Sequence, residues 1–211
     1  MIVAIGRELG AGGLSVGEAL ARDLGACLLD ERMLVGELSR RGGFSAEYLQ
    51  RIDEQPPSLA SSFLRDIARA AALADAADAR SPEGAVHDEI RAVVLERARR
   101  GHAVLIGHGG AKLLEGHVAR GEIFSLLLHA GRPWRVRRVM ERFAIDRAEA
   151  EERVRRTDEL RRRYCAYFFS LDLYDAHNYD LVIDTERVGI ASAIRIATEA
   201  VRAALPVSAH S

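Results

Sequence analysis

The feature that most constrains the fold lies at the start of the chain, where a short apolar run leads into a cluster of glycines. Residues 2–5 are all apolar and Gly6 ends the run, which is typical of a strand buried on both faces of a sheet. Residues 10–13 read Gly-Ala-Gly-Gly, and apolar residues at helical spacing begin at Leu14. Glycines let a backbone approach a ligand closely, and the first turn of a helix offers unbonded N–H groups. The segment therefore predicts a strand, a phosphate-binding loop and a helix, with a plain glycine turn as the alternative.

Four further apolar runs, each ended by glycine or a polar residue, follow along the chain. Helical patterns separate most of them, so the sequence predicts an α/β fold with a parallel sheet of about five strands. Residues 45–100 are helical in pattern and broken at their prolines, and a last helix is expected over 190–205. The 211 residues suit a single domain. The four runs are Cys27–Asp30, Ala103–Gly107, Phe124–His129 and Leu181–Asp184.

The composition narrows the class of protein. Apolar residues make up 48% and charged residues 29% of the chain, which is ordinary for a water-soluble domain. The formal net charge is -1, so the molecule has no general attraction for nucleic acid. No apolar run approaches a membrane span, the start lacks the features of a signal peptide, and Cys27 and Cys165 form no metal or disulfide pattern. We expect a cytoplasmic protein with no membrane or nucleic-acid partner and no metal held by side chains alone.

Polar residues and glycines follow four of the expected strands at the point where each strand ends. In an open parallel sheet the carboxyl ends of the strands share one edge, and ligands bind beyond that edge. These segments should therefore converge and form a site. They are Gly6-Arg7-Glu8, Asp30, Gly107-His108-Gly109-Gly110 and Asp184-Thr185.

The glycine loop lacks the cation that usually accompanies it. The strict pattern G-x-x-x-x-G-K-[ST] is absent, and the only lysine of the chain, Lys112, lies far along the sequence. Arg7 is the nearest cation and could substitute by charge, although its planar fork differs from an ammonium group. Ser15 falls in the first helical turn, where a hydroxyl can meet a phosphate or a Mg²⁺ ion. The candidate phosphate-binding residues are Arg7, Gly10, Ala11, Gly12, Gly13, Leu14 and Ser15.

Residues 132–163 are much denser in arginine than the rest of the chain. Guanidinium groups suit the holding of a phosphate or of a phosphoryl group during transfer. Asp158 lies three residues before Arg161, so the two share a helix face and can pair, leaving other arginines free. The alternative is a solvated helix in which acidic residues at 149–152 neutralise about half of the arginines. The arginines that we favour for catalysis are Arg132, Arg155 and Arg161.

His108 stands between two glycines at a strand end, which is a more informative place than a helix surface. Its imidazole could hold a substrate phosphate or base, and a purely local backbone contact is an equal alternative. An aromatic cluster lies beside the arginines and is interpreted as packing rather than as base-stacking groups. It consists of Tyr164, Tyr167, Phe168 and Phe169.

Taken in order, these motifs resemble the cytidylate kinase-like family, whose members open roughly I-S-R-E-x-G-S-G-G. Residues 4–13 carry that opening, and the second strand ends in aspartate, Asp30, as it does in the family. The likeness spans almost the whole chain in the right order, and residues 56–83 are its weakest stretch. Its later segments are 104–109, 135–141, 158–161 and 178–185.

The resemblance implies a nucleoside monophosphate kinase: a P-loop fold of three α/β/α layers, with ATP and Mg²⁺ on the glycine loop. Residues from about 31 to 100 would form a helical substrate-binding insertion, and residues from about 144 to 170 a lid. The family reaction is phosphoryl transfer to a small acceptor, nominally a pyrimidine nucleoside monophosphate such as CMP or dCMP, by positioning and charge neutralisation. Whether the chain forms a homodimer stays open. The monophosphate would lie near Asp30, Gly107, His108 and Gly109, and the lid would carry Arg155, Asp158 and Arg161.

Three positions depart from the family pattern by lacking positive charge where phosphates would lie. Gly13 replaces a lysine, Leu14 follows where a basic residue often compensates, and His108 replaces an arginine. We therefore keep two hypotheses, an active transferase and a nucleotide-binding or regulatory module that is no longer catalytic. A third hypothesis, nucleic-acid binding through the arginine-dense helices, is disfavoured by the interleaved acidic residues.

Overall fold

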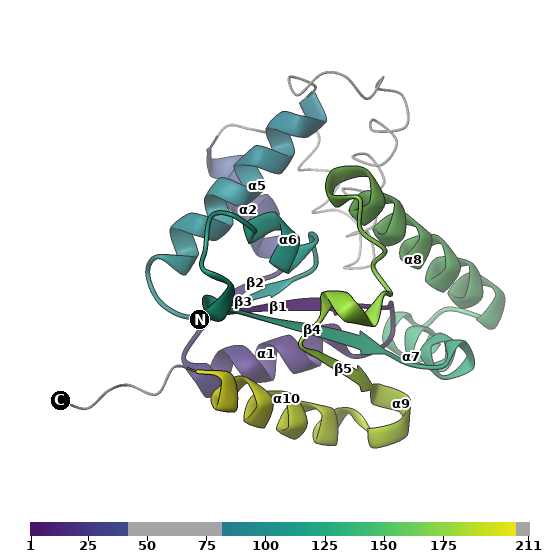
Figure 1. Ribbon diagram of the computed structural model, residues 1–211. Helices are drawn as coiled ribbons and strands as arrows, with labels where there is room; N and C mark the ends of the chain where they lie inside the picture. Colours follow the sequence, from purple (N-terminus) through teal and green to yellow (C-terminus); the bar gives the residue numbers. More distant parts are fainter. Residues whose placement is uncertain (42–81, 206–211) are drawn as a thin grey trace.

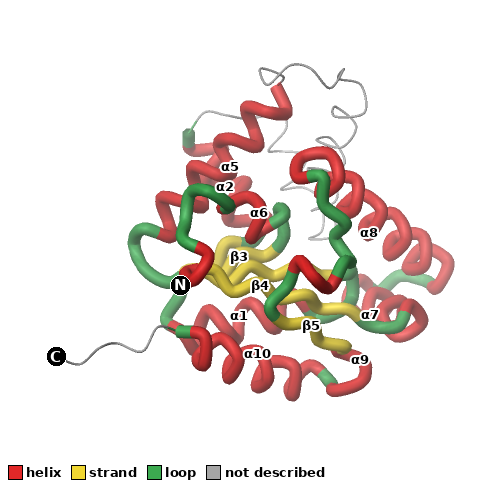
Figure 2. The backbone as a smooth tube through the Cα atoms, in the orientation of Figure 1, coloured by secondary structure: helices red, strands yellow, loops and turns green. Residues whose placement is uncertain are grey.

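The computed structural model describes residues 1–41 and 82–205. Its sheet holds five parallel strands in the order β2-β3-β1-β4-β5, and helices cover both faces (Figures 1 and 2). The strands are β1 (Ile2–Arg7), β2 (Cys27–Leu29), β3 (Ala103–Ile106), β4 (Ile123–His129) and β5 (Leu181–Asp184). The helices are α1 (Gly13–Leu24), α2 (Glu31–Arg40), α5 (Pro82–Ala98), α6 (Gly110–Leu114), α7 (Arg132–Phe143), α8 (Arg147–Phe169), α9 (Thr185–Val188) and α10 (Ile190–Ala204).

β1 is the central strand, because an apolar run without alternation can be buried on both faces. Ile5 pairs with Ile106 of β3 on one side and with Leu126 of β4 on the other. Val3 and Ile5 face the layer of α1 and α10, whereas Ala4 faces the layer of α2, α5 and α6 (Figure 1). The chain thus forms three layers around one sheet.

The ends of the helices follow from local chemistry. α1 ends at Gly25, which adopts a φ of 60° and donates its N–H to a carbonyl of the last turn. α8 begins after Asp146, whose carboxylate accepts the N–H of Glu149. α7 and α8 lie beyond the carboxyl ends of β1 and β4, where ligands of such sheets bind (Figure 1).

The α/β fold class and the parallel sheet predicted from the sequence are confirmed, and each of the five expected strands is present within two residues of its expected bounds. Residues 42–81, which hold much of the expected substrate-binding insertion, lie outside the described residues. Among the helices described, none combines the length and the apolar character needed to cross a bilayer.

Candidate active site

The glycine loop presents backbone N–H groups. Gly10 and Gly12 have φ angles of 87° and 85°, a left-handed conformation that strains other residues, and the carbonyl of Glu8 accepts the N–H of Ala11. Within the described part of the chain, the N–H groups of residues 12–15 donate to no backbone carbonyl. Four consecutive free N–H groups thus lie at the positive end of a 12-residue helix, which is the arrangement that favours an anion.

Arginines from α7 hold the carbonyls of the same loop. Arg135 Nη1 donates to the carbonyl of Leu9 at 3.1 Å, and Arg138 Nε donates to the carbonyl of Gly10 at 3.1 Å. The guanidinium of Arg138 also lies 4.8 Å from the ring centre of Trp134. Because these carbonyls are bonded away from the helix end, the loop can leave its N–H groups free.

Arg135 is the buried centre of this arrangement. It pairs with Asp158 at 2.6 Å and with Glu8 at 3.2 Å, and only 7% of its side chain is exposed. Asp158 in turn accepts the N–H of Leu9 at 2.8 Å. α7, α8 and the loop are thus joined through one chain of charged hydrogen bonds.

The arginines chosen from the sequence lie in different places. Arg161 is 11% exposed, donates to the carbonyl of Arg7 at 3.2 Å and lies 3.9 Å from Asp158, so the predicted pairing of Asp158 with Arg161 is confirmed. Arg155 is exposed and pairs with Glu152 at 2.7 Å, as the solvated-helix alternative predicts. Arg132 is exposed and makes no hydrogen bond or ion pair with any other described residue. The exposed Ser15 is free to meet a ligand. Roles for these residues toward a ligand stay predictions.

Two carboxylates follow β2, namely Asp30, which the sequence suggested, and Glu31. Asp30 accepts the N–H of Met33 at 2.8 Å and so caps the first turn of α2. Its neighbour Glu31 shares the electrostatic surroundings of Arg7 and Arg161. Burial raises the pKa of Glu31 to about 8, against the opposite effect of the two arginines. The sequence analysis missed Glu31 because it selected only the first polar residue after the apolar run of β2, which is Asp30.

Beyond β3 the chain makes a left-handed turn. Gly107, His108 and Gly109 have φ angles of 90°, 57° and 67°, which is costly for the histidine. His108 is 4% exposed and its ring meets the ring of Tyr164 edge-on, 6.3 Å between centres. A side chain on Gly109 would overlap the ring of Phe169. Tyr164, Phe168 and Phe169 of the aromatic cluster pack together beside this turn, as expected, whereas Tyr167 is 42% exposed.

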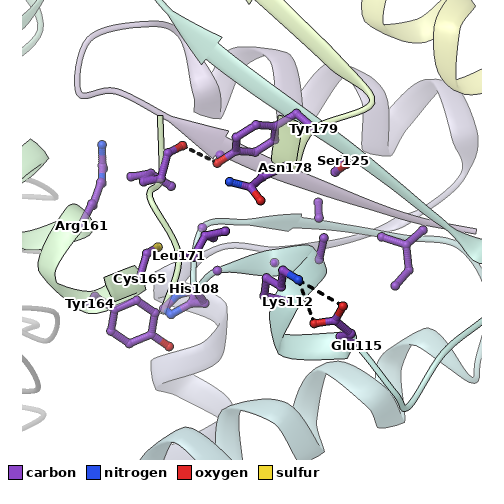
Figure 3. Close-up of a pocket in the computed structure, with 18 of the residues that line it drawn as sticks. His108, Lys112, Glu115, Ser125, Arg161, Tyr164, Cys165, Leu171, Asn178 and Tyr179 are labelled. Carbon is purple, nitrogen blue, oxygen red and sulfur yellow. Dashed lines mark hydrogen bonds and ion pairs between the residues drawn. The ribbon is translucent and has the colours of Figure 1, made fainter. Parts of the chain in front are cut away.

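A cavity of about 460 Å³ opens beside the turn, between α6 and the segment that leads from α8 to β5 (Figure 3). Its end near α8 is lined by Arg7, Arg161, Cys165 and the β3 turn, and Tyr179 forms part of its wall. At its other end Lys112 pairs with Glu115 at 3.0 Å (Figure 3). The cavity is thus in contact with the arginines that lie next to the glycine loop.

A parallel sheet in this strand order, a glycine loop opening α1 and arginines above the loop define the P-loop kinase class. The cytidylate kinase-like family model matches residues 2–187, and the chain belongs to this family. The family is one of nucleotide kinases.

Individual relatives are distant but match over most of their length. Cytidylate kinases of Pyrobaculum aerophilum and Pyrobaculum islandicum are 23% and 25% identical over 199 residues, which cover 94% of this chain and 91% of each relative. An uncharacterized Eubacterium ventriosum protein superposes with a TM-score of 0.67 at 18% identity, covering 96% of this chain and 98% of its own. Shikimate kinase from Bacteroides thetaiotaomicron gives 0.50 at 13% identity with the same coverage. These structures establish the shared fold.

Proposed function

We propose that this protein transfers the terminal phosphoryl group of ATP to a small acceptor, nominally a pyrimidine nucleoside monophosphate such as CMP or dCMP. The observation that carries the proposal is the row of free N–H groups at residues 12–15, which form the N-terminal end of α1. Arg161 lies nearby and donates to the carbonyl of Arg7. Phosphoryl transfer needs positioning and charge neutralisation rather than covalent help from the protein, and this arrangement supplies both.

The donor site fits ATP with Mg²⁺. Side chains on Gly10, Gly12 or Gly13 would meet Arg135, Ile190 and Arg7 respectively, so the loop keeps its backbone bare. Among residues 1–41 and 82–205 no cluster of three His, Cys, Asp or Glu side chains could hold a metal alone. Mg²⁺ would therefore be held by the phosphates and the Ser15 hydroxyl, and when bound it neutralises phosphate charge.

The acceptor side is assigned to the rim between β2 and β3. Asp30, Gly107, His108 and Gly109 stand at these strand ends, and Arg161 lines the adjoining cavity. The pyrimidine nucleotide is suggested by the relatives, which are named cytidylate kinases. Arg132 and Arg155, exposed in this structure, would act only if they turn toward the phosphates.

The test is a coupled assay of ADP formation with ATP, Mg²⁺ and a panel of nucleoside monophosphates. We expect turnover with CMP or dCMP that exceeds turnover with purine nucleotides. Turnover confined to an unrelated acceptor such as a sugar alcohol would refute the substrate assignment while keeping the donor site.

The second candidate function is a nucleotide-binding module without catalysis. It is favoured by Gly13, Leu14 and His108, which stand where the family resemblance leads us to expect lysine or arginine. Calorimetry separates the candidates: ATP binding combined with no turnover on any acceptor supports the module and rejects the transferase.

A further inference from the structure

The two departures of this loop from the G-x-x-x-x-G-K pattern stand at its two ends. If Gly12 is taken as the second glycine of the pattern, Arg7 stands where the first glycine belongs, and Gly13 stands where the lysine belongs. Compared with that pattern, the loop has an additional cation at its first position, Arg7, and lacks the cation at its last position, Gly13. The structure shows how these two positions are related in space.

The side-chain stem of Arg7 lies directly against Gly13. A Cβ atom built on Gly13 would stand 2.8 Å from Cγ, 3.1 Å from Cβ and 3.4 Å from Cδ of Arg7. These atoms are the base of the side chain, which cannot swing aside without moving the whole arginine. Arg7 therefore occupies the space into which a lysine at position 13 would start.

The guanidinium of Arg7 lies against a second glycine, Gly107. A Cβ on Gly107 would overlap Nη1 of Arg7, so the guanidinium passes across the bare backbone of the β3 turn. Arg7 and Arg161 then line the same cavity. The arginine thus runs from the end of β1, past the start of α1, to the rim where donor and acceptor phosphates would meet.

The guanidinium of Arg7 has N–H groups that are available to a ligand. Among residues 1–41 and 82–205 it makes no hydrogen bond and no ion pair, and Arg161 Nε is likewise buried without a partner. The side chain of Arg7 is half-buried and lies near the like charge of Arg161 and the opposite charges of Glu31 and Asp158. Its unbonded N–H groups are donors that a phosphate could use.

We infer that Arg7 and Gly13 form a reciprocal exchange. Arg7, at the end of β1, supplies the cation that a lysine supplies in loops with the G-x-x-x-x-G-K pattern. Position 13 is a glycine because the side chain of Arg7 occupies the space that a larger residue would need. The exchange rests on the proposed function, in which the loop holds the β- and γ-phosphates of ATP. The positive charge of the loop would therefore come from position 7 instead of position 13.

The test is a pair of substitutions made singly and together in the full chain, with ATP affinity measured by calorimetry. We expect Arg7→Gly to weaken ATP binding by about tenfold or more, as loss of a charged hydrogen-bonding group does. Gly13→Lys should give no gain while Arg7 is present, because the two side chains compete for one space. In the Arg7→Gly background, which completes the G-x-x-x-x-G-K pattern, Gly13→Lys should recover most of the lost affinity. Arg22→Ala, which removes an exposed arginine of α1, serves as control.

Two further arms keep the outcome decisive. Arg7→Gln keeps the stem against Gly13 and loses the charge, so it should weaken ATP binding with little change in the thermal unfolding midpoint. An equal gain from Gly13→Lys in both backgrounds, or unchanged ATP affinity in Arg7→Gln, would overturn the exchange. Loss of CMP binding with ATP binding intact would also overturn it and assign Arg7 to the acceptor. A wild-type protein that binds no ATP would instead refute the proposed function, and the exchange with it.

Discussion

Arg135 and Asp158 form a 2.6 Å ion pair that connects α7 to α8, and both side chains also hydrogen-bond to the backbone of Leu9 in the glycine loop. Arg135 donates to the carbonyl of Leu9, and Asp158 accepts the N–H of Leu9. The position of the glycine loop is therefore set by helices that are about 130 to 150 residues away in the sequence. This makes the pair a positioning device for the loop.

Removal of Arg135 should destabilise the fold strongly. Arg135→Ala leaves the carboxylates of Glu8 and Asp158 without their shared cation, and breaking a buried pair costs about 3 kcal/mol or more. Urea denaturation measures the free energy of unfolding. Arg137→Ala, an exposed arginine of the same helix, should change it by less than about 0.5 kcal/mol. Equal effects of the two substitutions would show that the pair does not hold the loop.

The pair should also be energetically coupled. In a double-mutant cycle of Arg135→Ala and Asp158→Asn, we expect the two losses to fall short of additivity by about 1–3 kcal/mol, since either change breaks the same bond. Replacing Asp158→Asn by Glu159→Gln, a partly exposed neighbour on α8, should give an additive cycle. Additivity in both cycles would contradict a direct link.

The sequence predicted the strands and the loops that surround the site more completely than it predicted which side chains lie in it. Strand-end residues could be found because an apolar run followed by glycine or a carboxylate has few other meanings. The choice between Arg132 and Arg135 depends on which helix face meets the loop, and Arg135 lies one turn before Val139 on the buried face. The sequence contained that periodic signal, but ranking by charge alone overlooked it. The contact of Arg7 with Gly13 and the position of Glu31 depend on tertiary packing, which no local pattern encodes.

Glu31 should make stability depend on pH in a defined direction. Burial raises its pKa from 4.5 to about 8 in the folded chain, despite Arg7 and Arg161. Between these values the folded state keeps a proton that the unfolded state has released, so the free energy of unfolding should fall as pH rises through this window. Glu31→Gln cannot ionise and should remove that part of the decline. Urea denaturation at several pH values from 5 to 9 checks this, and parallel curves for the two proteins would speak against it.

Gly107 should resist substitution more than Gly116, a glycine of similar backbone conformation. Its φ is 90° and a Cβ would overlap the guanidinium of Arg7, whereas Gly116 has a φ of 77° and nothing within 4 Å of a Cβ. Gly116→Ala therefore reports backbone strain alone, about 1 kcal/mol. Gly107→Ala should cost more than that and should also weaken ATP binding, measured by calorimetry. If both variants lose stability equally and bind ATP alike, the placement of Arg7 is wrong.

Under the proposed function, the glycine loop and the arginines beside it act together as one centre for phosphoryl transfer. The most direct measurement follows the labelled γ-phosphate of ATP into product, with CMP or dCMP as acceptor, in the wild-type protein and in Arg161→Gln. We predict labelled diphosphate in step with ADP for the wild type, and a loss of at least about a hundredfold in rate for Arg161→Gln. Absence of labelled diphosphate from the wild type, while it binds ATP, would contradict the claim.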